Sequence, residues 1–158
     1  MISPTLDAFC QKLTAGQRLI AIDYGGKKLG VAISDPSLCM ALPMNIIVEP
    51  NDERKIAHII RISNENAAGG IVLGLPINMD GTRSEQTEIV QKFADKLASK
   101  TNLSIFLQDE RMTTKAADNL LKTFGLKRKE RNARDDSIAA CLILDTVLDY
   151  YQKNKSKD

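Results

Sequence analysis

Four carboxylates stand where an apolar run ends or a helix begins. Asp23 ends one apolar run, Asp109 and Glu110 follow another, and Asp136 lies at the start of the last predicted helix. An apolar strand rarely ends on a carboxylate unless another group compensates the charge. Carboxylate oxygens are preferred ligands of Mg²⁺ and Mn²⁺, and paired divalent cations can activate water and stabilise a leaving oxygen. The pattern predicts a metal site that hydrolyses a phosphodiester bond.

We expect Asp23, Glu110 and Asp136 to be the catalytic residues and the metal ligands, with Asp23 bridging two cations. Asp109 is the weaker candidate, because side chains alternate across a strand and Asp109 and Glu110 should face opposite sides. Structural alternatives stay open. Asp23 is also placed for an Asx-type hydrogen bond in the turn that follows, and Glu110 for a surface ion pair with a basic neighbour. Arg111 either neutralises Asp109 or contacts phosphate.

Positive charge lies near these acids in two places. The turn Gly25–Gly26 leads into Lys27 and Lys28, and glycine lets a phosphate come close because it has no Cβ. Residues 127–134 carry five positive charges and one negative charge just before the last helix. Their alternative is an ordinary solvated loop, and their position beside an acidic cluster favours contact with a phosphate backbone. The predicted nucleic-acid contacts are Lys27, Lys28, Arg111, Lys127, Arg128, Lys129, Arg131 and Arg134.

Composition narrows the class of protein. The 158 residues suit one domain over 1–152, followed by a charged tail over 153–158. The three cysteines are widely spaced and form no C-x-x-C pair, which favours a reducing cytoplasm over a zinc or disulfide framework. No apolar run is long enough for a membrane span, and no signal peptide is indicated. Aromatic residues make up 4% of the chain, with no Trp, so recognition by base stacking has little support.

The apolar pattern predicts an α/β fold. Strands are expected at 19–23, 29–34, 43–48, 71–76 and 103–107, and helices at 52–67, 84–99, 113–124 and from Asp135 or Asp136 onward. One of these two acids, which we take to be Asp135, caps the last helix while the other points inward. Gly69 and Gly70 are expected to end the first helix. Three strands form an antiparallel meander and two more join in parallel, giving a mixed five-stranded sheet flanked by helices.

The next helix is expected to begin with a capping box of Thr82 and Glu85 and to bury Ile89, Phe93 and Leu97. The two parallel strands end near the acids, and ligands of such sheets gather at the carboxyl ends of the strands. The sheet topology thus agrees with the chemistry predicted from the carboxylates.

Four motifs in order resemble the YqgF/RuvX family of RNase H-like nucleases. They cover most of residues 18–150 and are residues 23–35, then Gly74-Leu75-Pro76 with Asn78-Met79-Asp80-Gly81, then residues 109–114, then Asp136-Ser137-Ile138-Ala139-Ala140. The resemblance implies an RNase H-like fold and a nuclease. Family members are described as candidate Holliday junction resolvases and as nucleases that mature the 5′ end of pre-16S ribosomal RNA. The family usually has Thr at the position of Gly26 and Arg at that of Lys28.

Two other classes of protein stay open. ATPases of the actin and sugar-kinase type open with a similar turn, but they need a longer chain to bind ATP between two domains. A non-catalytic factor that binds RNA or the ribosome is the main alternative to a nuclease. The sequence does not choose between precursor ribosomal RNA and branched DNA as substrate, and it is compatible with a monomer or a weak homodimer.

Overall fold

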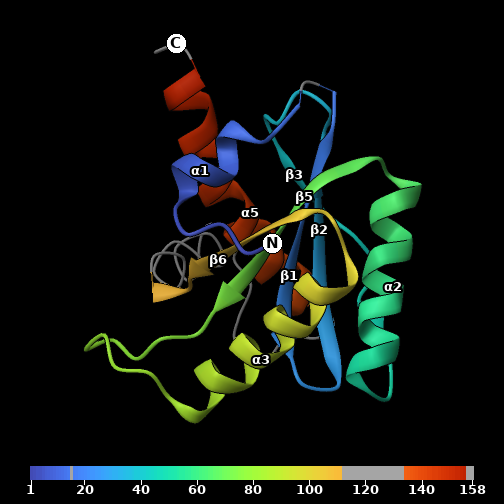
Figure 1. The fold of residues 1–158 in the computed structure, drawn as a ribbon, viewed down its shortest axis with the longest axis vertical. Coiled ribbons are helices and arrows are strands. Elements are labelled where there is room, and N and C mark those ends of the chain that lie inside the picture. The colour runs from blue at the N-terminus through green and yellow to red at the C-terminus, as the bar shows by residue number, and fades with distance from the viewer. Residues whose placement is uncertain (15, 112–133, 156–158) are drawn as a thin grey trace.

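A mixed sheet forms the centre of the molecule in the computed structural model, which describes residues 1–14, 16–111 and 134–155. Its strand order is β3-β2-β1-β5-β6, and β4 also pairs with β2 (Figure 1). The strands are β1 (Arg18–Gly25), β2 (Lys28–Ser34), β3 (Ala41–Pro43), β4 (Ile47–Val48), β5 (Ala68–Leu75) and β6 (Ser104–Asp109). β1 and β2 are antiparallel. β5 runs parallel to β1, and β6 runs parallel to β5. The predicted mixed α/β architecture is confirmed.

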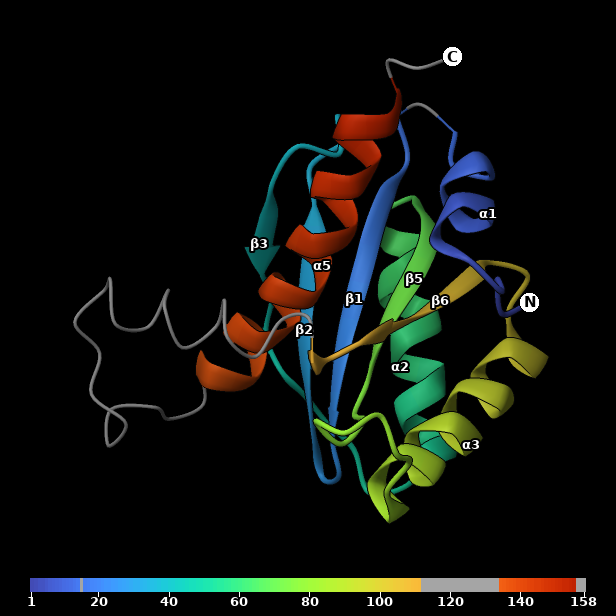
Figure 2. The same ribbon diagram turned by 90° about the vertical axis from the view of Figure 1, so that its left-hand side faces the viewer.

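Helices cover both faces of this sheet. They are α1 (Leu6–Gln11), α2 (Asp52–Glu65), α3 (Glu85–Lys100) and α5 (Arg134–Asn154). α2 and α3 pack on one face, and α5 crosses the other (Figure 2). Alternation along β1 serves both layers, because Ile20 and Ile22 join the α2–α3 core while Leu19 and Ala21 join the α5 core. Both sheet faces are therefore buried, as expected for central strands with continuous apolar runs.

The third predicted strand is divided into two short ones. β3 pairs Pro43 with Ala32, and β4 pairs Ile47 with Leu29. Between these two pairs there are three residue steps along β2 and four along the segment that joins β3 to β4. This joining segment therefore holds one extra residue, as in a β-bulge. Pro43 also has no N–H to donate to a continuing ladder. The expected five strands therefore become six.

Two helix boundaries also differ from the prediction. α2 ends at Glu65 with Asn66 as its C-cap, and Ala67 takes the left-handed conformation with φ of 53°. Gly69 and Gly70 do not end this helix but belong to β5, where a Cβ on Gly70 would lie 2.8 Å from the ring of Phe9. The glycine is needed for packing against α1 rather than for a helix cap.

The N-cap of α3 differs from the predicted pair, Thr82 and Glu85. Ser84 is the N-cap, and it exchanges hydrogen bonds with Thr87, whereas Thr82 bonds to Asp80 in the preceding loop. This start turns Val90 into the core and leaves Ile89 42% exposed, so the predicted burial of Ile89 is wrong. Phe93 and Leu97 are buried as expected.

Several predictions concern residues outside the described part of the chain. These are the helix over 113–124, the basic side chains at positions 127–131 and 134, and the side chain of Asp136. The backbone of α5 begins at Arg134 and continues through Lys153 and Asn154, two residues assigned from sequence to the charged tail. α1 was not predicted, because its six residues are too short to show helical periodicity. Within the described ranges, no helix is both long and apolar enough to cross a membrane.

A buried hydroxyl supports the irregular start of β1. The pairing of β1 with β5 shifts in register between Arg18 and Leu19, and the Leu19 N–H donates instead to Oγ of Ser34 at 2.8 Å. We predict that Ser34→Ala lowers the free energy of unfolding by about 1–3 kcal/mol, because it leaves a buried N–H without an acceptor. Urea denaturation measures this. Ser99→Ala, at an exposed position of α3, should stay within about 0.5 kcal/mol of the wild type. Equal effects of the two changes would contradict the assignment.

Candidate metal centre

Asp23 and Glu110 come together on the face of the sheet that α5 covers. Asp23 shares the alternation of Leu19 and Ala21, which face α5. Glu110 follows β6 directly, and its N–H donates to the carbonyl of Leu75 at 3.0 Å, which continues the parallel pairing by one residue. β1 and β6 are separated by β5 alone, so the two acids lie on either side of that strand.

Gly74 of β5 makes room between them. A Cβ on Gly74 would lie 2.6 Å from Oε1 of Glu110 and 2.6 Å from Cδ1 of Ile143 in α5. Real Cβ atoms do not approach other atoms so closely, so the Glu110 carboxyl can cross this strand only where a side chain is missing. The glycine at the end of an apolar run therefore has a direct part in building the site.

Burial and charge act together on Glu110. Desolvation, followed by the charge of Asp23 and a hydrogen bond with it, raises the pKa of Glu110 from 4.5 to about 7, and the charge of Asp109 adds to the effect. The two carboxyls therefore favour a proton held between them. The same oxygens suit a divalent cation, which supplies the positive charge that the proton otherwise provides. This donor set fits Mg²⁺ or Mn²⁺, which prefer oxygen ligands.

The third predicted ligand, Asp136, lies at a position where only the backbone is described. α5 runs along the sheet in the direction opposite to β1, so its first turn lies toward the carboxyl end of that strand (Figure 2). Oγ of Ser137 donates to the carbonyl of Met44 at 2.8 Å and fixes this turn. Among the described residues, no three Asp, Glu, His or Cys side chains form a metal cluster. The role of Asp136 therefore stays a prediction.

Asp109 is held away from this pair. Its Oδ2 accepts hydrogen bonds from Nη2 of Arg111 at 2.7 Å and from Nε at 3.0 Å. Its Oδ1 accepts from Nε at 3.2 Å and from the Arg111 backbone N–H at 2.9 Å. These bonds lower the pKa of Asp109. Of the two interpretations of Arg111, the partnership with Asp109 is thus observed. Contact of Arg111 with phosphate stays a prediction.

The turn between β1 and β2 carries Lys27 and Lys28, both exposed, toward solvent. Gly26 has φ of +77°, a conformation that a β-branched residue adopts only with strain. A Thr at this position, which the family resemblance leads one to expect, would be strained in this conformation. The two lysines remain available as the predicted phosphate contacts.

A buried lysine anchors this turn, and the sequence analysis missed it. Lys55 is 6% exposed, and its Nζ donates to the carbonyl of Gly26 at 2.5 Å. The same ammonium lies 5.0 Å from the centre of the Tyr24 ring and 3.6 Å from the carboxylate of Asp52. Tyr24 in turn donates its hydroxyl hydrogen to Asp52 at 3.2 Å. The sequence holds one hint of this burial, because Lys55 directly precedes Ile56 and both belong to the buried face of α2.

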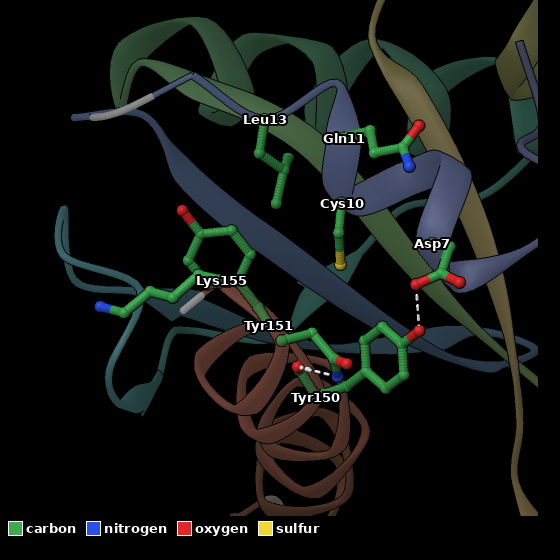
Figure 3. A pocket seen from close by; sticks show the side chains of 8 residues that line it. Asp7, Cys10, Gln11, Leu13, Tyr150, Tyr151 and Lys155 are labelled. Atoms are coloured by element: carbon green, nitrogen blue, oxygen red, sulfur yellow. Dashed lines mark hydrogen bonds between the residues drawn. The ribbon is translucent and has the colours of Figure 1, made fainter. Parts of the chain in front are cut away.

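Two hollows in the described surface lie away from the acids. One, of about 510 Å³, opens between α1 and the end of α5 and is lined in part by Cys10, Tyr150 and Tyr151 (Figure 3). There Tyr150 donates a hydrogen bond to Asp7, and burial raises the pKa of the Cys10 thiol to about 11, so the thiol is a poor nucleophile. The other, of about 590 Å³, lies between α2 and α3. Neither is lined by Asp23 or Glu110.

Two solved structures show a similar fold. RuvC of Thermus thermophilus, solved in complex with a Holliday junction, aligns with a TM-score of 0.56 at 12% identity, covering 87% of this chain and 95% of that one. The large terminase nuclease of the thermophilic phage G20c aligns with a TM-score of 0.51 at 12% identity, covering 82% and 80%. At these identities the likeness shows the fold, which is the RNase H-like fold predicted from the motifs.

Sequence relatives then give the family. The RuvX family, described as Holliday junction resolvase, matches residues 17–150. A candidate pre-16S rRNA nuclease of Rickettsia africae is 52% identical over 149 residues, which are 94% of this chain and 97% of that protein. Its counterpart in Rickettsia felis is 51% identical over 153 residues, covering 97% and 99%. The chain belongs to the RuvX family, and its class is that of nucleases, which hydrolyse phosphodiester bonds.

The raised pKa of Glu110 predicts a pH dependence of stability in metal-free protein. The folded state holds the proton of Glu110 more tightly than the unfolded state. The stabilisation from this proton is therefore complete below pH 4.5 and is lost as pH rises to about 7. Glu110→Gln mimics the neutral acid and should not lose it. The melting temperature of Glu110→Gln in EDTA should therefore rise relative to wild type across this interval.

Glu65→Gln, which removes an exposed carboxylate at the end of α2, provides the control. Its difference from wild type should stay nearly constant over the same pH range. A constant difference for Glu110→Gln as well would show that Glu110 is not a buried, proton-sharing acid.

Gly74 yields a second prediction for the site. Gly74→Ala should displace the Glu110 carboxyl and cost about 1–3 kcal/mol of stability through overpacking against Ile143. It should also reduce the rise in melting temperature that Mn²⁺ produces relative to EDTA. Gly69→Ala lies in the same strand, at its other end, where the atoms nearest to the new methyl belong to the side chain of Gln17. That variant should keep the full response to Mn²⁺, and a full response of Gly74→Ala would contradict the arrangement.

Proposed function

We propose that this protein is a divalent-metal-dependent endonuclease that trims the 5′ end of precursor 16S ribosomal RNA. The observation that carries the proposal is the Asp23–Glu110 pair, two carboxyls that meet across β5 at the carboxyl ends of parallel strands, where burial and the charge of Asp23 raise the pKa of Glu110. The names of the Rickettsia relatives support the RNA substrate. Branched DNA is the second candidate, because the family description names Holliday junctions.

The roles of individual side chains follow from this proposal. Asp23 and Glu110, with Asp136 from α5, would hold Mg²⁺ or Mn²⁺. Such cations, when bound, activate water and stabilise the leaving oxygen. The ion pair of Asp109 and Arg111 keeps a second carboxylate from competing for the cations.

Phosphate contacts are proposed for the basic residues around this edge. Each neutralised phosphate strengthens binding through release of counterions and makes it dependent on salt. Lys27 and Lys28 reach solvent from the anchored turn. The full set is Lys27, Lys28, Arg111, Lys127, Arg128, Lys129, Arg131 and Arg134.

The cellular setting is part of the proposal. Maturation of ribosomal RNA places the enzyme in the cytoplasm, and trimming of one RNA end needs only a monomer. Resolution of a four-way junction would instead favour a homodimer with two sites. A non-catalytic ribosome-associated factor is the alternative to both enzymes, and it requires no cleavage at all.

A cleavage assay separates these possibilities. Purified protein is incubated with a 5′-extended 16S RNA, a four-way DNA junction and a linear duplex, each in Mg²⁺, Mn²⁺ or EDTA. The proposal expects metal-dependent cuts in the RNA extension. Preferential cutting of the junction would establish the second candidate, and binding without cleavage in both metals would establish the non-catalytic one.

Asp23→Asn gives the decisive variant. The neutral amide is a poorer ligand for Mg²⁺, so cleavage should fall on the order of a thousandfold, which corresponds to several kcal/mol of lost charge stabilisation. Binding of the RNA should persist, as gel shift would show. Asp95→Asn changes an exposed acid of α3 and should cut at the wild-type rate. A wild-type rate for Asp23→Asn would remove the metal site from the mechanism.

A further inference from the structure

Met79 is unusually exposed for a large apolar side chain. It is 80% exposed, more than any other large hydrophobic residue in the described part of the chain. It lies in the loop between β5 and α3, at the carboxyl edge of the sheet, and Figure 1 shows this loop extending past the end of β5. A single exposed apolar residue is common in itself. The surroundings of Met79 give this one its interest.

The loop that carries Met79 is closely braced by polar bonds. The Asn78 N–H donates to the carbonyl of Thr82 at 3.0 Å, and the Gly81 N–H donates to the carbonyl of Asn78 at 2.8 Å. The Asn78 side chain bonds to the Thr82 hydroxyl at 2.9 Å, and Oδ1 of Asp80 accepts from both the backbone and the hydroxyl of Thr82. Every neighbour of Met79 is thus used in closing the turn. The methionine is held outward at its tip.

The same turn lies against Arg111, at the end of β6 where the candidate metal ligand Glu110 also stands. A Cβ on Gly81 would lie 3.4 Å from Nη1 of Arg111, which directly follows Glu110. The bonds from Thr82 lower the pKa of Asp80, and the nearby charge of Arg111 lowers it further. Asp80 and Arg111 therefore interact, and Met79 directly precedes Asp80 in this turn, at the carboxyl edge of the sheet.

The chain offers few apolar alternatives at this edge. Tyr24 is packed against Phe93 on the opposite face, with ring centres 4.8 Å apart, and Phe9 is packed against Phe106. The exposed apolar residues Met40 and Leu42 belong to the other side of the sheet, beside or within β3. Val48 is 60% exposed beside Lys28, but it is held in β4, whereas Met79 lies in a loop and is the most exposed large apolar side chain in the described part of the chain.

We propose that Met79 inserts against a nucleobase next to the cleaved phosphate and opens the base step there. This inference rests on the nuclease function proposed above and adds a substrate contact to it. Apolar wedges, Met among them, are used by nucleic-acid-binding proteins to unstack a base step. The unbranched, polarizable thioether adapts to either face of a base, and the braced turn supplies the rigid support that a wedge needs.

The first test compares rates. Met79→Ala should lower kcat/KM on a fully paired substrate by on the order of tenfold, whereas Met79→Leu should keep most of it. Met40→Ala, exposed by 54% and remote from the acids, should act like wild type. A mismatch placed at the cleaved step supplies the opening in advance, so it should restore the rate of Met79→Ala. All variants should melt with wild type, because the side chain is exposed.

The second test observes the base directly. The substrate carries 2-aminopurine beside the cleavage position mapped with wild type, and Asp23→Asn protein binds it without cutting. Binding of the Asp23→Asn protein should raise the fluorescence as the base unstacks. A second substitution in the same protein, Met79→Ala, should remove this rise, whereas Met79→Leu should preserve it.

The outcomes separate the two claims. If wild type cleaves the substrate, and Met79→Ala changes neither the cleavage rate nor the fluorescence, the wedge is overturned and the nuclease stands. An equal loss on paired and mismatched substrates would also overturn it, because a wedge is needed only where the step is closed. Absence of cleavage by wild type on every substrate would overturn the nuclease and the wedge together.

Discussion

The approach of two acids across one strand is the constraint on which the rest of the site depends. Asp23 and Glu110 belong to strands on either side of β5, and their carboxyls can meet only over Gly74, where no Cβ stands in the way. Burial, together with the charge of Asp23 and a hydrogen bond with it, raises the pKa of Glu110 to about 7. The fold accepts an unfavourable pair of charges at a fixed place, which is the usual condition for holding a cation.

The layers of the molecule maintain this arrangement from both sides. On the α5 face, Ile143 packs beside Gly74 and closes the space behind Glu110. On the opposite face, Arg111 neutralises Asp109, so consecutive acids at the end of β6 are separated into one paired and one proton-sharing carboxyl. The strict alternation of a strand achieves this separation without any further device.

Much of this could be predicted from sequence because it depends on local rules. Apolar runs give the strands, and alternation separates Asp109 from Glu110. The misses arise where tertiary contacts decide. Gly70 was interpreted as a helix end because glycine is common there, but its purpose is room for the ring of Phe9. The buried Lys55 escaped notice because lysine is normally exposed, and only the fold reveals that a carbonyl, an aromatic ring and a carboxylate surround it.

The anchoring of Gly26 by Lys55 has a consequence for how the hairpin can behave as a binding element. A turn tied to α2 by a buried ammonium loses its conformational freedom when the protein folds. If Lys27 and Lys28 contact the substrate as proposed, binding orders little beyond the exposed ends of these two side chains, so the entropic cost of association is small. The hairpin would then act as a preformed, rigid binding element.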